Sequence, residues 1–196
     1  RTNSFLLSGD KSTSPDFAGA VTTPRWYSIN TIEVLAPKTT AAVAVIGNSI
    51  TDGYGLTPDI TTPSRWTDVF SRALLANAPT SNVGVLNMGI GGTNVLGNGL
   101  TTGNMRFQRD VLEQSGLRWV IIFYGVNDIG GGASSANLID GLKKMATAAK
   151  NKGSKVYGGT ITPFNGHSYY SAAREAVRNS VNEWIRSGGG GAFDAV

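Results

Sequence analysis

The stretch AVAVIGNSITDGYG, residues 42–55, decides how this chain of 196 residues is interpreted. Small and β-branched apolar residues fill its first part, which favours a strand that is buried on both faces. The apolar run ends at Gly47, and Asn48 and Ser49 open a polar, turn-prone segment. We therefore expect a buried strand that ends in a sharp turn and presents a serine.

Further short apolar segments follow the first one, and amphipathic segments separate them. The predicted strands are 42–46, 83–87, 119–124 and 155–159. The predicted helices begin near Ser64, near Ser134 or Ser135, and near Ser171, because serine caps helix N-termini well. The residues expected on their buried faces are Trp66, Val69, Phe70, Ala73 and Leu74, then Leu138, Leu142, Met145, Ala146 and Ala149, then Ala173, Val177, Val181, Trp184 and Ile185. Alternating strands and helices of this length predict an α/β fold with an open, doubly wound parallel sheet.

Residues 1–40 differ in composition from the rest, and we treat them as a separate N-terminal segment. They are rich in Ser, Thr, Pro, Gly and Asp, with short β-leaning pieces at 25–29 and 31–35. We expect an extended or β-rich cover there, followed by one domain over 41–196. Near the other end, the glycines at 188–191 predict a flexible connection, and 192–196 reads as the opening of another strand. The first residue is not Met, which indicates a processed protein or a fragment.

Composition excludes several classes of protein and site. The net charge is +4, but the basic residues, Arg106 and Arg109 among them, are scattered, which indicates a solvated surface and argues against nucleic-acid binding. The absence of cysteine and the presence of one histidine argue against a metal site. No apolar run approaches the roughly 18 residues that a membrane span needs.

Chemistry is expected where the predicted strands end, because ligands bind at the carboxyl edge of an open α/β sheet. The first strand is followed by Ser49, the second by a glycine-rich loop that includes Gly92, and the third by Asn127. Acyl transfer needs a nucleophile together with N–H donors for the developing oxyanion. A serine hydroxyl, a backbone amide without a side chain and a side-chain amide could supply these groups.

The spacing and order of these blocks resemble the SGNH (GDSL-type) hydrolases, a family of esterases and lipases. The blocks are Gly47-Asn48-Ser49-Ile50-Thr51-Asp52-Gly53, then Asn87-x-Gly89-Ile90-x-Gly92, then Gly125-Val126-Asn127-Asp128, and the resemblance covers about residues 41–196. It implies a three-layer, flavodoxin-like α/β/α fold. It also implies that Ser49 is the nucleophile and that Gly92 and Asn127, with the Ser49 N–H, bind the oxyanion.

Two positions depart from the family pattern. Asn48 stands where the family usually has Asp, which keeps hydrogen-bonding ability and removes a charge. The family's base and orienting acid form an Asp-x-x-His block after the fifth strand, and the sequence stops at Val196, where that strand would begin. We therefore expect the catalytic His and Asp in a C-terminal remainder of the same protein. The lone histidine, His167, follows the fourth strand, where a pocket or solvated residue is more usual than a base.

Other features of the sequence have structural interpretations. The segment at residues 89–92 lacks the full dinucleotide-binding spacing, so we expect no cofactor. Asp52 and Asp128 are expected to accept hydrogen bonds from backbone N–H groups around their turns. Trp66 and Trp184 are expected in the core.

The sequence thus favours a serine esterase that acts on small carboxylic esters through an acyl-enzyme on Ser49, with carbohydrate O-acetyl groups as one candidate substrate. The alternative is a carbohydrate- or ester-binding domain without a complete triad, and a flavodoxin-like cofactor binder is a third hypothesis. The expected partner is a small-molecule or carbohydrate ester. We expect an extracellular location, because the N-terminal segment resembles what precedes the hydrolase domain in some secreted members.

Overall fold

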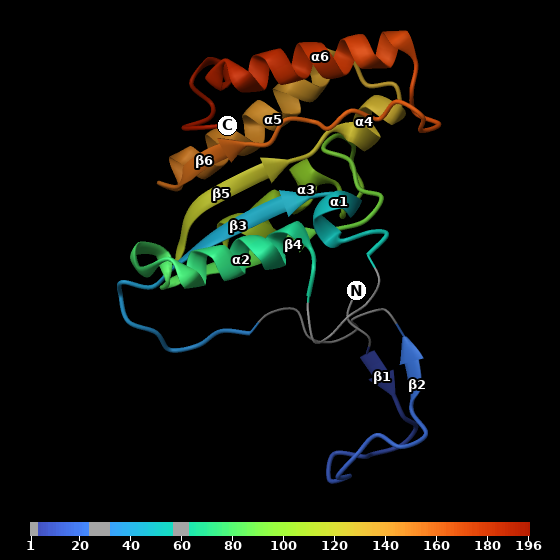
Figure 1. Cartoon of the computed structure of the whole chain (residues 1–196), viewed down its shortest axis with the longest axis vertical. Coiled ribbons are helices and arrows are strands. Elements are labelled where there is room, and N and C mark those ends of the chain that lie inside the picture. The colour runs from blue at the N-terminus through green and yellow to red at the C-terminus, as the bar shows by residue number, and fades with distance from the viewer. Residues whose placement is uncertain (1–3, 24–31, 57–62) are drawn as a thin grey trace.

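The computed structural model describes residues 4–23, 32–56 and 63–196. In this part of the chain, a four-stranded parallel sheet forms the centre of the molecule (Figure 1). Its strands, in the order β4-β3-β5-β6, are β3 (Ala41–Gly47), β4 (Val83–Gly89), β5 (Leu117–Phe123) and β6 (Lys155–Gly158). The four predicted strands are confirmed to within two residues at each end. Because β4 and β5 lie on opposite sides of β3, the strand order reverses at β3, where ligands bind in such sheets.

The register of the sheet brings its three central strands to an end at one level. Gly47, the last residue of β3, pairs with Gly89 of β4 on one side and with Phe123 of β5 on the other. The segments that follow these residues therefore leave the sheet side by side. This register places all three predicted site loops at the same edge.

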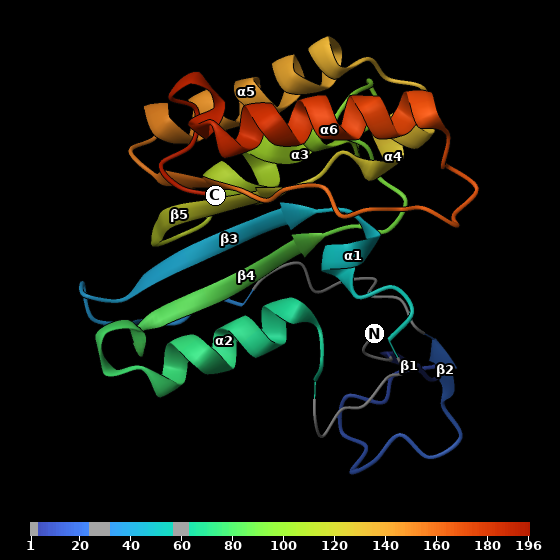
Figure 2. The ribbon, with the colours of Figure 1, turned by 45° about the horizontal axis from the view of Figure 1, so that its top comes forward.

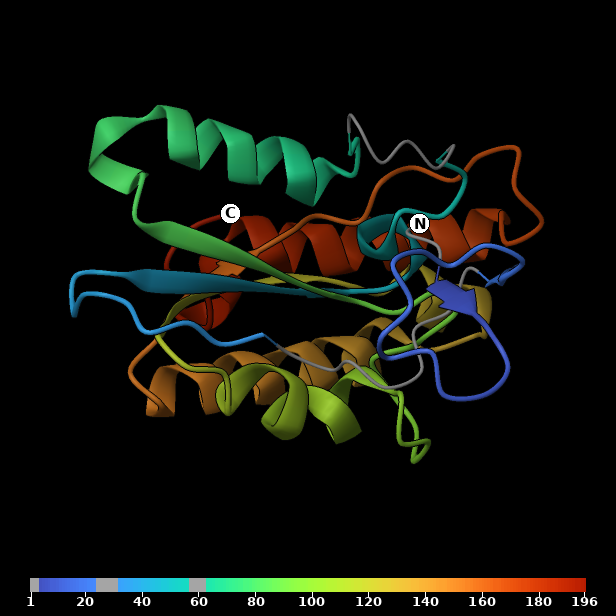
Figure 3. The same cartoon turned by 90° about the horizontal axis from the view of Figure 1, so that it is seen from below.

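Helices cover both faces of the sheet, which confirms the three-layer α/β/α fold (Figure 3). On one face lies α2 (Trp66–Ala76), and on the other lie α3 (Gly103–Phe107) and α5 (Ser135–Asn151). A further helix, α6 (Ala172–Arg186), packs beside α5 and α4 (Val126–Gly130). The long helices α5 and α6 begin after Ser134 and Ser171, whose hydroxyls accept the N–H groups of Asn137 and Arg174.

The buried faces agree with the sequence prediction for α5 and only in part for α2 and α6. The five predicted residues of α5 are all buried. In α2, however, Val69 is 51% exposed and Ala73 is also exposed. The helix packs on β4, which is an edge strand, so the described residues leave part of its apolar stripe uncovered. Ala173 of α6 is exposed as well, because it lies in the first turn, beside an exposed loop.

The two tryptophans, which were predicted to lie in the core, lie at its margin and are half-buried. Trp66 borders an open apolar groove that it shares with Phe123 and Tyr157. Trp184 packs edge-on against Phe193, with ring centroids 5.3 Å apart. Both side chains still contribute apolar contacts, in keeping with aromatic residues that are rarely fully enclosed.

Short helical turns complete the domain. They are α1 (Ser49–Asp52), η1 (Ala78–Thr80), η2 (Gln108–Leu112), which is a π-helical turn, and η3 (Gly188–Gly190). The glycines at 188–191, predicted as a flexible connection, form an ordered turn in which Gly189 is buried, with a φ of 62°. Beyond it the Asp194 N–H bonds the Val156 carbonyl, and the Gly158 N–H bonds that of Ala195. The chain thus runs alongside β6, as the strand predicted there would.

The N-terminal segment contains a small hairpin of β1 (Ser4–Leu6) and β2 (Val21–Thr23), which lies apart from the sheet (Figures 1 and 2). The predicted β-leaning piece 25–29 falls outside the described residues. Of the piece 31–35, residues 32–35 form no strand and are exposed, because none of the described strands lies alongside them to complete a ladder. No helix in the described ranges has the length and apolarity to cross a membrane.

Candidate active site

Ser49 is the first residue of a helical turn that folds back directly from the end of β3 (Figure 2). The turn begins at Asn48, which is 2% exposed and whose Oδ1 accepts the Ile50 N–H at 3.1 Å. A side chain at Gly47 would place its Cβ 2.7 Å from the Thr51 Cβ, so only glycine allows this close return. Ser49 itself is half-buried. Asn48 therefore caps the turn with its amide oxygen, and this cap needs no negative charge.

The glycine-rich loop after β4 is tied to this turn by two hydrogen bonds. The Gly91 N–H donates to Asp52 Oδ2 at 3.0 Å, and the Ile90 N–H donates to the Gly47 carbonyl at 3.1 Å. Gly92 follows with a φ of 78° and is exposed. Within residues 4–23, 32–56 and 63–196, no group accepts the backbone N–H of Ser49 or of Gly92. Two backbone donors are therefore available at this edge of the sheet.

Asn127 comes from α4, the turn that follows β5. Its Nδ2 donates to the Thr93 carbonyl at 2.9 Å, which uses one of its two amide hydrogens and leaves the other. The neighbouring Asp128 is 2% exposed and accepts the N–H groups of Val95 and Leu96, both at 3.0 Å. Burial raises the pKa of Asp128, and the backbone hydrogen bonds offset only part of that effect.

Asp52 and Asp128 accept hydrogen bonds from backbone N–H groups, as predicted, but these groups belong to a different loop. Each was expected to bond backbone groups of its own turn. Instead, the two carboxylates reach across to the loop after β4 and hold it at Gly91 and at residues 95–96. The structure thus brings Ser49, Gly92 and Asn127 to one edge of the sheet, on loops that are joined to each other by hydrogen bonds.

His167 lies in an exposed loop between β6 and α6. Its Nδ1 accepts the Tyr169 N–H at 3.2 Å, and its ring packs edge-on against the Tyr169 ring at 4.6 Å. In the described part of the chain it bonds neither Ser49 nor a carboxylate. This is the environment of the solvated loop residue that the sequence analysis favoured over a base.

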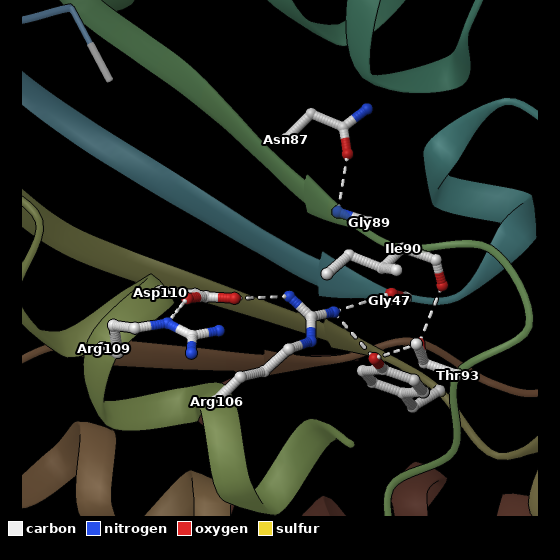
Figure 4. A network of polar contacts seen from close by, with 9 residues as sticks. Gly47, Asn87, Gly89, Ile90, Thr93, Arg106, Arg109 and Asp110 are labelled. Carbon is white, nitrogen blue, oxygen red and sulfur yellow. Dashed lines mark hydrogen bonds and ion pairs between the residues drawn. The ribbon is translucent and has the colours of Figure 1, made fainter. Parts of the chain in front are cut away.

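Sequence reasoning was wrong about Arg106, which it grouped with the solvated cations. Its side chain is 1% exposed and lies beneath the site (Figure 4). Its Nη2 donates to the Gly47 carbonyl at 3.1 Å and to the Tyr124 hydroxyl at 2.7 Å, and its Nη1 pairs with Asp110 at 3.2 Å. The available signal was the spacing of four between Arg106 and Asp110, which places the two charges on one face of a helix.

Over the described ranges, no group of His, Cys, Asp and Glu side chains could hold a metal ion.

Comparison with known proteins agrees with this geometry. The sequence model of the GDSL-like lipase/acylhydrolase family matches residues 45–193, which is most of the chain and includes every site loop. The chain belongs to this family. Membership places it among the carboxylic ester hydrolases and confirms the resemblance found in the sequence.

Solved structures share the fold at low sequence identity. The SGNH-hydrolase family esterase AlinE4 superposes with a TM-score of 0.63 at 17% identity, over 80% of this chain and 75% of that one. A GDSL-family lipolytic protein from Veillonella parvula gives 0.61 at 20% identity, over 80% and 77%. TesA gives 0.60 at 24% identity, over 74% and 73%. The curated proteins contain no match to the sequence.

Proposed function

We propose that this protein hydrolyses small carboxylic esters and that Ser49 is its nucleophile. The Ser49 hydroxyl attacks the ester carbonyl, and a tetrahedral intermediate forms with its negative charge on the former carbonyl oxygen. Collapse of the intermediate expels the alcohol and leaves an acyl group on Ser49. Water then attacks the acyl-enzyme and releases the acid.

The oxyanion is proposed to be bound by the N–H groups of Ser49 and Gly92 and by the side-chain amide of Asn127. The two backbone donors have no acceptor in the described residues, and Asn127 has one amide hydrogen to spare. Among the described residues, no atom lies within 4 Å of the position that a Cβ would take at Gly92, so the space beside this residue is open. Gly92 also has no side chain of its own that could cover its N–H. Donors that are fixed before the reaction stabilise the charge without a reorganisation cost.

One observation carries the proposal: the loops that bear these groups are bonded to each other as well as to the sheet. Asp52, in the turn of Ser49, holds Gly91 at 3.0 Å, and Asn127 holds the Thr93 carbonyl at 2.9 Å. The nucleophile and the donors therefore keep fixed relative places, as acyl transfer requires and as a merely capped turn would not.

The proton acceptor for Ser49 is proposed to be a histidine, oriented by an aspartate, from a part of the protein outside these 196 residues. The exposed position of His167 and its bond to the Tyr169 N–H support this assignment. Acetyl groups on carbohydrate are the first substrate class to test, beside simple acetyl esters.

The experiment compares Ser49→Ala with the wild type in the full-length protein, which includes the proposed histidine, with Ser180→Ala as a matched control on the exposed face of α6. We expect kcat on p-nitrophenyl acetate and on an acetylated sugar to fall at least about 10³-fold for Ser49→Ala, with Tm unchanged. The control should keep wild-type kcat. Equal rates in the wild type and Ser49→Ala would end the esterase proposal, and calorimetric binding of the acetylated sugar without turnover would favour the binding-domain alternative.

A further inference from the structure

The buried guanidinium of Arg106 is the feature that the proposed mechanism leaves unused. A charged group at 1% exposure is costly unless it is well paired. Asp110 supplies one ion pair at 3.2 Å, but in the described part of the chain the Arg106 Nε–H has no partner. A buried ion pair is weak evidence of a contribution to stability, so the placement of this cation calls for another explanation.

In the series of hydrogen bonds that begins at Arg106, each group donates to the next one farther from the arginine. The Arg106 Nη2 donates to the Tyr124 hydroxyl at 2.7 Å, and that hydroxyl lies 2.7 Å from Thr93 Oγ1. Since Thr93 Oγ1 donates its only hydrogen to the Ile90 carbonyl at 2.7 Å, Tyr124 must be the donor to Thr93. Each hydroxyl therefore accepts one bond and donates one. A chain that starts at a cation and runs one way is strengthened by mutual polarisation.

The network contacts each of the three loops that carry the proposed catalytic groups. At the turn before Ser49, the Gly47 carbonyl accepts a hydrogen bond from the Arg106 Nη2 (Figure 4). It also accepts one from the Ile90 N–H. In the loop after β4, the bond from the Thr93 hydroxyl to the Ile90 carbonyl closes a turn that contains Gly92. At the third loop, the Thr93 carbonyl receives the Asn127 amide at 2.9 Å.

We propose that Arg106, acting through Tyr124 and Thr93, is a positioning residue that holds the Ser49 turn and the two oxyanion-binding loops in fixed register. It acts from beneath the sheet edge, through Gly47, Ile90 and Thr93, without touching the substrate. The kinetic part of this proposal rests on the proposed esterase function. Its structural part, the fixing of the loops, does not.

Two nearly isosteric variants test the proposal. Tyr124→Phe removes only the hydroxyl that links Arg106 to Thr93, and Thr93→Val removes the next hydroxyl along. We expect each to lower kcat about 10–100-fold with KM within about twofold, because a misplacement near 1 Å costs about that much in rate. Thr93→Ser keeps the hydroxyl and should restore most of kcat. Arg109→Ala is the matched control, since Arg109 pairs with the same Asp110 but is 60% exposed and bonds none of the loops.

A second readout separates the two proposals. Amide hydrogen exchange should become faster at Ile90, whose N–H bonds the Gly47 carbonyl, in Tyr124→Phe and Thr93→Val, and stay unchanged at the buried β3 amides. If the full-length wild type hydrolyses no ester, the proposed function fails, and the exchange result still decides whether the network fixes the loops. Unchanged exchange at Ile90, or exchange raised equally across β3, would overturn the positioning role.

Discussion

Replacing Asp128 by Asn tests how the loop after β4 is held. The carboxylate is 2% exposed and uses both oxygens, Oδ2 for the Val95 N–H and Oδ1 for the Leu96 N–H, each at 3.0 Å. An amide has one acceptor oxygen, so one N–H loses its partner and faces an NH₂ group. An unsatisfied buried donor costs about 1–3 kcal/mol, and removal of a buried charge offsets part of it. We expect a net loss of about 1–2 kcal/mol at pH 7, or a Tm lower by about 2–8 °C for a chain of this size.

The pH dependence of this loss has a definite sign. Because burial raises the pKa of Asp128 above its ordinary value of 3.8, the folded state holds the proton more tightly than the unfolded chain. The stability of the wild type that depends on Asp128 is therefore fully present below 3.8 and declines as the pH rises through the folded pKa. Asn has no proton to lose, so the stability gap between the two proteins should be wider at pH 4 than at pH 7.

The assay is thermal unfolding followed by circular dichroism at pH 4 and pH 7, with each protein compared to Asp140→Asn. Asp140 is 61% exposed on α5 and, among the described residues, pairs only with Lys144, so this control should change stability by no more than about 0.5 kcal/mol. An Asp128→Asn protein as stable as the wild type at pH 7, or a gap that widens as the pH rises, would refute the reasoning.

Two further predictions concern the turn of Ser49 and the lone histidine. Gly89→Ala should destabilise the fold by about 2–3 kcal/mol in urea unfolding, because the new Cβ would overlap backbone atoms of Thr51 and Asp52. Gly84→Ala on the same strand should be nearly neutral, because the new Cβ would lie 3.9 Å from the Ala41 carbonyl oxygen, an ordinary contact; equal losses in the two variants would contradict the packing argument. His167→Ala should leave ester hydrolysis within about threefold of wild type, since its side chain is exposed. A kcat loss as large as that of Ser49→Ala would instead make His167 the base.

Periodicity and strand-end residues predicted most of the fold and the three candidate site residues. The strand β3 is wholly apolar and buried, and α5 buries its full predicted stripe, so the local pattern and the tertiary packing agree there. The helical spacing of apolar residues wrongly predicted burial in α2, where Val69 is exposed beside an edge strand. Which strand lies at the edge depends on the order of strands, and the amphipathic stripe of one helix does not contain that information.

Arg106 shows a different limit of sequence reading. An arginine is on the surface in most proteins, and the spacing of four to Asp110 predicts an ion pair but not its burial. Besides Asp110, its partners are Gly47 and Tyr124, which are more distant in sequence and reach it only because β3 and β5 end side by side. Long-range polar pairing has no period along the chain, so it becomes visible only in the assembled fold.

The close approach of α1 to the ends of β3 and β4 explains why this edge of the sheet can hold the Ser49 turn. Gly47 and Gly89 pair with each other across β3 and β4, and a side chain on either would collide with α1. Their absence of side chains lets α1 sit directly on the ends of both strands. The Gly47 carbonyl is then left open to two donors, the Ile90 N–H and Arg106. The same glycine that permits the sharp turn therefore also provides the acceptor through which the buried arginine can fix it.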